Sequence, residues 1–154
     1  MRKLTRRFII SSLNNLNLSK PIRYERYYID GTLRIQKKDN KYQKEILDED
    51  NNVIEKKDIP KLEFLKLKKD AYSSIIRDSY LLLEDNRISI KRYPGKYKGL
   101  YRVEVTFTSI TEQNEYIKES WMGEEITYSP LAFDKDLSKL SDNEFQKELK
   151  KYLK

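Results

Sequence analysis

The sequence predicts an α+β protein built on an antiparallel eight-stranded β-barrel or tunnel with a few flanking helices. Short runs of alternating apolar and polar residues recur along the chain between polar turns, which is the pattern of half-buried strands. Only 38% of the 154 residues are hydrophobic and 37% are charged, which suits a sheet with one wetted face. The 12 Tyr and 5 Phe supply bulk for one core, so we expect a single domain over residues 1–154.

Eight segments carry the strand pattern. They lie near residues 2–10, 22–29, 32–37, 41–47, 53–58, 74–83, 88–93 and 100–107. The last is the clearest, because Val103, Val105 and Phe107 alternate with polar residues. We expect the first and last segments to belong to one antiparallel sheet. Eight strands can close, fully or partly, into a barrel whose interior holds side chains or one small ligand.

Three segments are expected to be helical. The first lies near 62–69, after Pro60, with Leu62 and Leu65 on its apolar face. The second lies near 111–118. The third spans about 142–153, where Ser141 and Glu144 resemble a capping box. Phe145, Leu149 and Tyr152 form its apolar stripe, which we interpret as packing surface, with a partner-binding helix as the alternative.

Charge and residue usage narrow the classes of function. The chain has 32 Lys and Arg against 25 Asp and Glu, a net charge of +7, which favours anionic partners, although lysines filling a surface give the same balance. It has no Cys and no His, which excludes thiol and imidazole chemistry and leaves carboxylates and carbonyls to hold any metal, such as magnesium, manganese or calcium. No segment approaches a membrane span, so we expect a cytoplasmic protein with no membrane partner.

Basic side chains recur on the strand faces opposite the apolar residues. This set comprises Arg7, Arg34, Lys44, Arg77 and Arg102. On neighbouring strands of a curved sheet they would form one cluster, and the cost of burying unpaired cations means that an anion or carboxylates must share the space. Arginine is well matched to phosphate oxygens, so we predict that this set binds a phosphate-bearing anion. The alternative is an open sheet whose polar face is simply solvated.

Short motifs occur in a definite order along the chain. They are Lys3-Leu4-Thr5-Arg6-Arg7, Glu25-Arg26-Tyr27-Tyr28, Leu33-Arg34-Ile35-Gln36, Tyr42-Gln43-Lys44, Ile76-Arg77-Asp78-Ser79-Tyr80, Val103-Glu104-Val105-Thr106-Phe107, Trp121-Met122-Gly123-Glu124-Glu125-Ile126-Thr127 and Leu131-Ala132. Over roughly residues 2 to 140 they resemble the motifs of the CYTH, or triphosphate tunnel metalloenzyme, family. The late Trp-x-Gly turn and the ordered spacing are the most specific parts of this resemblance.

The resemblance implies an eight-stranded antiparallel tunnel in which basic residues grip triphosphate groups and glutamates hold a divalent metal. Family members include inorganic, thiamine and RNA triphosphatases and some adenylate cyclases. The chain departs from the family in its carboxylates, because Lys3 and Thr5 stand where the first Glu-x-Glu is expected. The positions expected for the family's second Glu-x-Glu are occupied by Ile54 and Lys56. Of the third pair, the chain keeps the first glutamate as Glu104 and has Thr106 in place of the second. Glu104 and Glu125 are therefore the candidate metal ligands.

Three functions remain open from the sequence. The first is a CYTH-like protein that binds a nucleotide, triphosphate or polyphosphate without efficient hydrolysis and without a required cofactor. The second is a magnesium- or manganese-dependent triphosphatase or nucleotide cyclase, with Glu25, Glu45 or Glu55 completing an altered carboxylate set. The third is a nucleic-acid-binding or assembly protein that uses the barrel as a scaffold. The sequence leaves the ligand's identity and the oligomeric state open.

Overall fold

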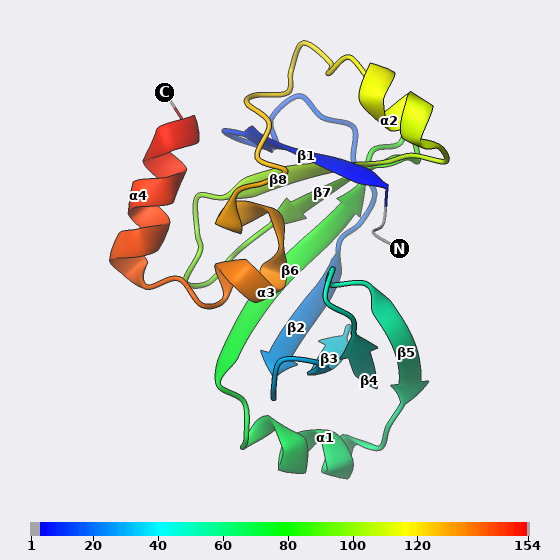
Figure 1. The fold of residues 1–154 in the computed structure, drawn as a ribbon, viewed down its shortest axis with the longest axis vertical. Helices are drawn as coiled ribbons and strands as arrows, with labels where there is room; N and C mark the ends of the chain where they lie inside the picture. Colours follow the sequence, from blue (N-terminus) through cyan, green and yellow to red (C-terminus); the bar gives the residue numbers. More distant parts are fainter. Residues whose placement is uncertain (1–3, 154) are drawn as a thin grey trace.

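The computed structural model describes residues 4–153 and contains the predicted eight-stranded antiparallel sheet (Figure 1). Lys3, where a glutamate was expected from the resemblance, lies outside the described residues. The strands are Thr5–Ile10 (β1), Ile22–Tyr28 (β2), Leu33–Lys38 (β3), Lys41–Leu47 (β4), Val53–Asp58 (β5), Ser73–Leu81 (β6), Ile88–Arg92 (β7) and Tyr101–Thr106 (β8). The helices are Lys61–Lys68 (α1), Ile110–Glu115 (α2), the 3₁₀ turn Pro130–Ala132 (η1), Asp134–Leu137 (α3) and Asp142–Tyr152 (α4).

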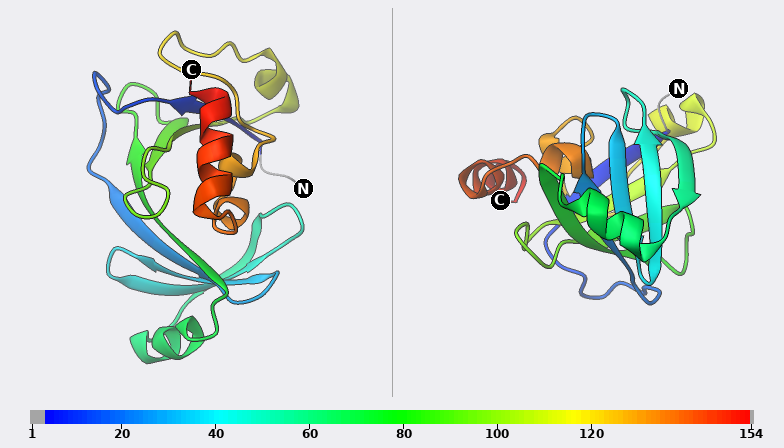
Figure 2. Two further views of the ribbon diagram at one scale, coloured as in Figure 1. Left: turned by 90° about the vertical axis from the view of Figure 1, so that its left-hand side faces the viewer. Right: turned by 90° about the horizontal axis from the view of Figure 1, so that it is seen from below.

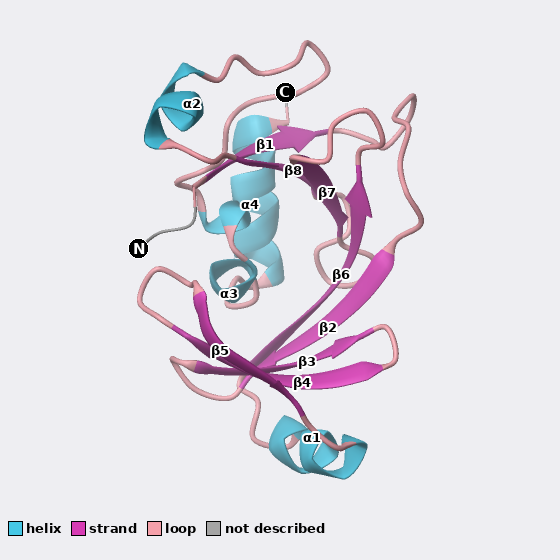
Figure 3. Ribbon diagram, turned by 90° about the vertical axis from the view of Figure 1, so that its right-hand side faces the viewer, coloured by secondary structure: helices cyan, strands magenta, loops and turns pink. Residues whose placement is uncertain are grey.

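The strand order is β1-β8-β7-β6-β2-β3-β4-β5, and each neighbouring pair is antiparallel. The sheet is strongly curved, so that β1, β8 and β7 face the half formed by β2 to β5 (Figure 3). β6 joins the halves because it pairs with β7 along one edge and with β2 along the other. The segment containing η1 and α3 lies on the concave side between the halves, and α1 lies outside the lower half (Figure 2).

The free edge of β1 is covered by the turn at residues 123–126. Ile9 donates its backbone N–H to the carbonyl of Glu124 at 2.9 Å, and Gly123 donates to the carbonyl of Ile9 at 2.8 Å. Ile126 donates to the carbonyl of Arg7 at 2.8 Å. The turn approaches so closely that a Cβ atom on Gly123 would lie 2.5 Å from the Ile9 carbonyl oxygen. The late turn therefore needs glycine for its packing against β1.

Replacing Gly123 with alanine should lower the free energy of unfolding by about 1–3 kcal/mol, because backbone atoms must move to admit the methyl group. Urea denaturation of the two proteins measures the difference. Gly95→Ala is the matched control, since a Cβ there meets nothing within 4 Å. Equal stability of Gly123→Ala and Gly95→Ala would contradict this account of the turn.

Two of the predicted helices pack as follows. In α4, Ser141 and Glu144 form the predicted capping box, and Phe145 and Leu149 are buried. Phe145 meets Tyr97 edge to face, with ring centroids 5.1 Å apart. The helix near 62–69 is confirmed as α1, but its predicted apolar face is wrong.

The buried residue of α1 is Phe64, which packs against Tyr27 and Tyr42 on the outer face of the sheet. Leu62 and Leu65 are 65% and 42% exposed. The side of α1 that packs against the sheet is therefore the one that carries Phe64, because Tyr27 and Tyr42 contact it, and not the one that carries the two leucines. Across residues 4–153, we find no helix that has both the length and the apolar character needed to cross a bilayer.

Candidate functional site

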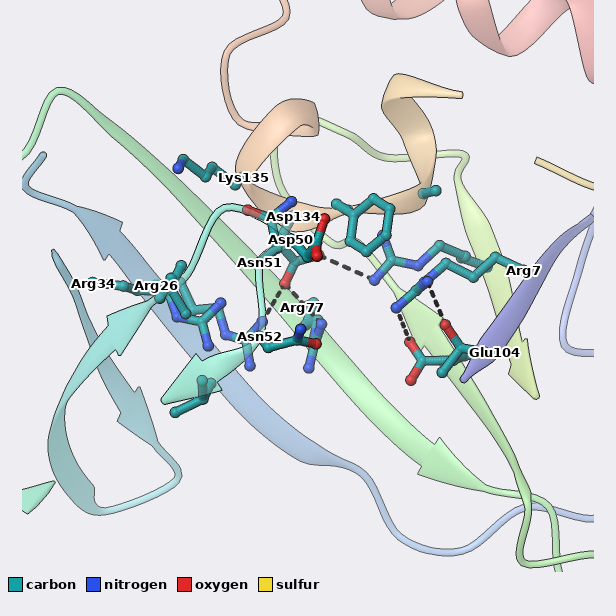
Figure 4. A pocket seen from close by; sticks show the side chains of 16 residues that line it. Arg7, Arg26, Arg34, Asp50, Asn51, Asn52, Arg77, Glu104, Asp134 and Lys135 are labelled. Carbon is teal, nitrogen blue, oxygen red and sulfur yellow. Dashed lines mark hydrogen bonds and ion pairs between the residues drawn. The ribbon is translucent and has the colours of Figure 1, made fainter. Parts of the chain in front are cut away.

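A cavity of about 370 Å³ lies between the concave face of the sheet and the η1–α3 segment (Figure 4). Its charged lining consists of the six cations Arg7, Arg26, Arg34, Arg77, Arg102 and Lys135 and the three carboxylates Asp50, Glu104 and Asp134. In Figure 4, Arg34 and Arg7 lie at opposite ends, with Arg26 and Arg77 between them. The lining thus carries more positive than negative charge.

Strand register brings these side chains to one face. Residues opposite one another in an antiparallel pair project to the same side of the sheet. Arg7 lies opposite Glu104 across β1 and β8, and Arg34 lies opposite Glu45 across β3 and β4. Period-2 alternation along each strand then places Arg102 beside Glu104 on the concave face. Four residues of the predicted basic set, Arg7, Arg34, Arg77 and Arg102, therefore line one cavity, and their binding of an anion stays a prediction.

Asp134, the first residue of α3, is the centre of the ion network. Its Oδ2 atom accepts hydrogen bonds from Arg26 at 2.9 Å and from Arg77 at 2.8 Å. Its Oδ1 atom accepts from the Tyr93 hydroxyl at 2.8 Å and from Arg102 at 3.2 Å. Burial opposes ionisation of this carboxyl, but Arg77, Arg102 and Arg26 outweigh burial and hold the pKa of Asp134 well below its ordinary value.

Two further carboxylates pair with arginines at the ends of the cavity. Glu104 lies 3.1 Å from Arg7, whose guanidinium also stacks 4.2 Å from the centre of the Phe133 ring. Burial, partly offset by Glu104, lowers the pKa of Arg7. Glu45 accepts from Arg34 at 2.9 Å and lies 3.2 Å from Lys56. Burial tends to raise the pKa of Glu45, but Arg34, Arg26 and Lys56 together outweigh burial and lower it.

The arginines keep donors that the protein does not use. A guanidinium carries five N–H donors. Within residues 4–153, the Nε atoms of Arg7, Arg77 and Arg102 are buried and have no hydrogen-bond partner. Arg77 donates from one nitrogen, to Asp134. Buried donors without partners are costly, so the protein does not fully satisfy these three guanidinium groups.

Lys44 does not belong to this site, and its predicted place on the concave face is wrong. It lies opposite Ile35 in the β3–β4 pair, and Ile35 is buried in the cluster that contains Phe64 of α1. Gln43 and Glu45 are the residues of β4 that face the concave side, where they bond to Gln36 and Arg34.

The two candidate metal ligands lie on opposite sides of β1. Glu104 pairs with Arg7 on the concave side, whereas Glu125 forms a two-point ion pair with Arg6, at 2.9 and 2.7 Å, in an exposed position. No group of three Asp or Glu side chains in the part of the chain described is arranged to hold a metal ion. Divalent cations need several oxygen ligands, so these carboxylates, each paired with arginine, do not fit such an ion.

Two important residues of the site were not among the predicted ones. Arg26 was known from the sequence only as part of a motif, and Asp134 lies beyond the last motif. One signal pointed to Asp134 indirectly, because several cations on a shared inner face require carboxylates or an anion beside them. It could not identify which of the 25 acidic residues takes that place.

The low pKa of Asp134 gives a test of its charge. A group whose pKa is depressed on folding stabilises the protein above its unfolded value, near 3.9, and that stability is lost as the pH falls through the folded value. The free energy of unfolding should therefore fall more steeply below about pH 4 in the wild type than in Asp134→Asn. Urea titrations between about pH 2 and 5 measure both slopes. Equal slopes in the two proteins would mean that these arginines do not lower the pKa of Asp134.

Comparison with known proteins bears on the fold. No family profile matches the chain, and no curated protein matches its sequence. Two solved structures of NE1496 are similar to it, one described as a hypothetical protein and the other as an inorganic triphosphatase. The first has a TM-score of 0.67 at 21% identity and covers 88% of this chain and 97% of that one. The second has a TM-score of 0.69 at 20% identity and covers 92% and 97%.

At 20–21% sequence identity, these similarities establish a shared fold and nothing about a shared function. The chain shares the fold of the NE1496 structures, an antiparallel eight-stranded sheet with a few flanking helices, as its sequence predicts.

Proposed function

We propose that this protein binds a phosphate-bearing anion, such as a nucleotide or an inorganic polyphosphate, in the arginine-lined cavity. The observation that supports the proposal most is the charge of the lining, where six cations face three carboxylates in about 370 Å³. Arginine donates in-plane pairs of hydrogen bonds that match phosphate oxygens, and the low dielectric of an enclosed site strengthens them. The NE1496 structure described as an inorganic triphosphatase adds support for a phosphate ligand.

We further propose that the bound anion is hydrolysed slowly or not at all and that no divalent metal is required for binding. Metal-assisted phosphoryl transfer needs carboxylates that fix the cation. In this cavity Glu104 and Asp134 are paired with Arg7 and with Arg26, Arg77 and Arg102, and Lys56 lies beside Glu45. These carboxylates pair with arginines and are not free to bind a metal ion. The lining has more cations than carboxylates, and these cations would neutralise the phosphates in place of a metal.

Calorimetric titration with tripolyphosphate and ATP, with and without a chelator, tests this function. We expect binding that persists at physiological salt and in the presence of the chelator, because enclosed charges are screened less than exposed ones. Lys44→Gln is the control for net charge, since Lys44 lies on the other face of the sheet. Loss of binding at physiological salt would instead indicate a solvated basic surface. Weaker binding by Lys44→Gln than by the wild type would indicate the same.

A metal-dependent triphosphate hydrolase is the second candidate, favoured by the fold shared with the NE1496 inorganic triphosphatase structure. It requires phosphate release from tripolyphosphate that depends on magnesium or manganese and saturates with substrate. Glu104 is the concave-face carboxylate from the original metal candidates, so Glu104→Gln should abolish that release if this candidate is right. We expect no such release from the wild type, and its detection would overturn the non-hydrolytic proposal.

A further inference from the structure

We propose that Asp134 fills one phosphate subsite of this cavity as a permanent part of the chain, so that the ligand is recognised through two phosphate groups rather than three. The preferred ligand is then pyrophosphate or the diphosphate end of a nucleotide. This inference rests on the proposed function and narrows it to a ligand class.

The contacts of Asp134 are those that a phosphate group would make. Its two oxygens accept four hydrogen bonds at 2.8–3.2 Å, three from arginines on β2, β6 and β8 and one from the Tyr93 hydroxyl. Carboxylate and phosphate oxygens accept the same charge-assisted bonds from guanidinium groups. A ligand group at this position would have to displace the carboxylate and leave it buried without its cations, which is strongly unfavourable.

The backbone that carries Asp134 is anchored in the core. Leu131, Ala132 and Leu137, on either side of it, are fully buried, and both leucines pack in the cluster that contains Ile9 and Tyr28 of the sheet. Ser138 bonds to Ser73 of β6 at 2.9 Å. Expelling the segment would expose these apolar side chains to water. Asp134 is therefore a fixed part of the cavity wall.

The remaining cations define what is left for a ligand. Arg102 uses its two terminal nitrogens on Asp134 and on the Leu131 carbonyl, and it is 1% exposed. Arg77 gives one nitrogen to Asp134 and keeps the others, whereas Arg26 gives one nitrogen to Asp134 and its Nε to Gln36 and keeps the third. Arg7 and Arg34 lie at the two ends, away from Asp134 (Figure 4). These four arginines can bind two phosphate groups. A third phosphate group would need the donors of Arg26, Arg77 and Arg102 that Asp134 already accepts.

Phosphate chain length is the variable that tests this proposal. Orthophosphate, pyrophosphate and tripolyphosphate are titrated calorimetrically into the wild type, Asp134→Ala and Asp136→Ala at physiological salt. The wild type and Asp136→Ala should bind pyrophosphate and tripolyphosphate within about threefold of each other. Asp134→Ala frees three arginines and should favour tripolyphosphate over pyrophosphate by about tenfold or more. Asp136 is the matched control, because it is an exposed carboxylate in the same helix.

A wild type that prefers tripolyphosphate about tenfold, with the same ratio in Asp134→Ala, would overturn this inference and leave the proposed function standing. A wild type that binds none of the three anions would defeat the proposed function instead. The subsite itself is then tested by thermal unfolding of Asp134→Ala with increasing phosphate.

Saturable stabilisation by phosphate, not reproduced by chloride at equal ionic strength, is expected, because phosphate takes the vacated place. Its absence overturns the inference. Should the alanine variant not fold, Asp134→Asn tests the same change in chain-length preference, since the amide keeps the shape and loses the charge.

Discussion

Replacing Asp134 with alanine is expected to lower the free energy of unfolding by about 3–5 kcal/mol, because removing one partner of a buried ion pair leaves an uncompensated charge. Here the change leaves Arg26, Arg77 and Arg102 close together without their shared carboxylate. It also removes the acceptor of the buried Tyr93 hydroxyl, whose pKa is raised by burial, with Asp134 contributing. Few single substitutions in this chain should cost as much.

Equilibrium urea denaturation at neutral pH and low phosphate measures this effect. Asp136→Ala is the control, because it makes the same change in composition and net charge at an exposed position of the same helix. It should change the free energy of unfolding by no more than about 0.5 kcal/mol. A loss of less than about 1 kcal/mol for Asp134→Ala would mean that the arginines separate into solvent and that no enclosed network exists.

The second large effect concerns affinity. Arg77→Gln should weaken binding of pyrophosphate by about 10- to 100-fold, since a charge-assisted bond contributes about 1.5–3 kcal/mol. Arg77 is 8% exposed, lies at the middle of the cavity and has a buried Nε without a partner within residues 4–153. Burial tends to lower the pKa of Arg77, but Asp134, Tyr93 and Glu104 together outweigh burial and raise it, so Arg77 keeps its charge.

Calorimetric titration at physiological salt checks this prediction, with circular dichroism to confirm that the variant is folded. Arg23→Gln is a matched control, because Arg23 is a half-exposed arginine on β2 that pairs with Asp78 rather than with cavity residues. Similar affinities for the wild type, Arg77→Gln and Arg23→Gln would show that phosphate does not bind in the cavity.

Much of the sheet was predictable because its strands carry a clear period. In β8, Val103 and Val105 are fully buried, and Arg102 and Glu104 face the cavity, as their alternation indicates. The capping box of α4 was also readable, since Ser141 and Glu144 have the spacing that satisfies backbone N–H groups at a helix start. In these segments local sequence and tertiary packing agree.

The sequence was less informative where both faces of a strand are covered. β4 has α1 over one face and the cavity on the other, so Tyr42 and Ile46 do not mark a single inner side. Lys44 shares the parity of these two residues, which was the available signal that it lies away from Arg34. A strand with mixed residues on both faces does not fix its own register.

Asp134 could not be predicted because its role depends on a contact between distant segments. It lies 57 residues along the chain from Arg77 and 108 from Arg26. A carboxylate after a short turn is ordinarily a surface residue. The burial of Leu131 and Leu137 carries it into the sheet, and this depends on the curvature of all eight strands.

The position of β1 constrains the order in which the molecule assembles. Its partners are β8 on one side and residues 123–126 on the other, so they leave the ribosome about a hundred residues after β1 itself. Contacts between segments so far apart in sequence form slowly, because the intervening chain must first be ordered. Phe8, Ile9 and Ile10 therefore lack these partners until residues 101–126 have been synthesised. β1 is therefore ordered only after β8 and residues 123–126 have been made, and Arg7, near the middle of β1, joins the cavity no earlier than that.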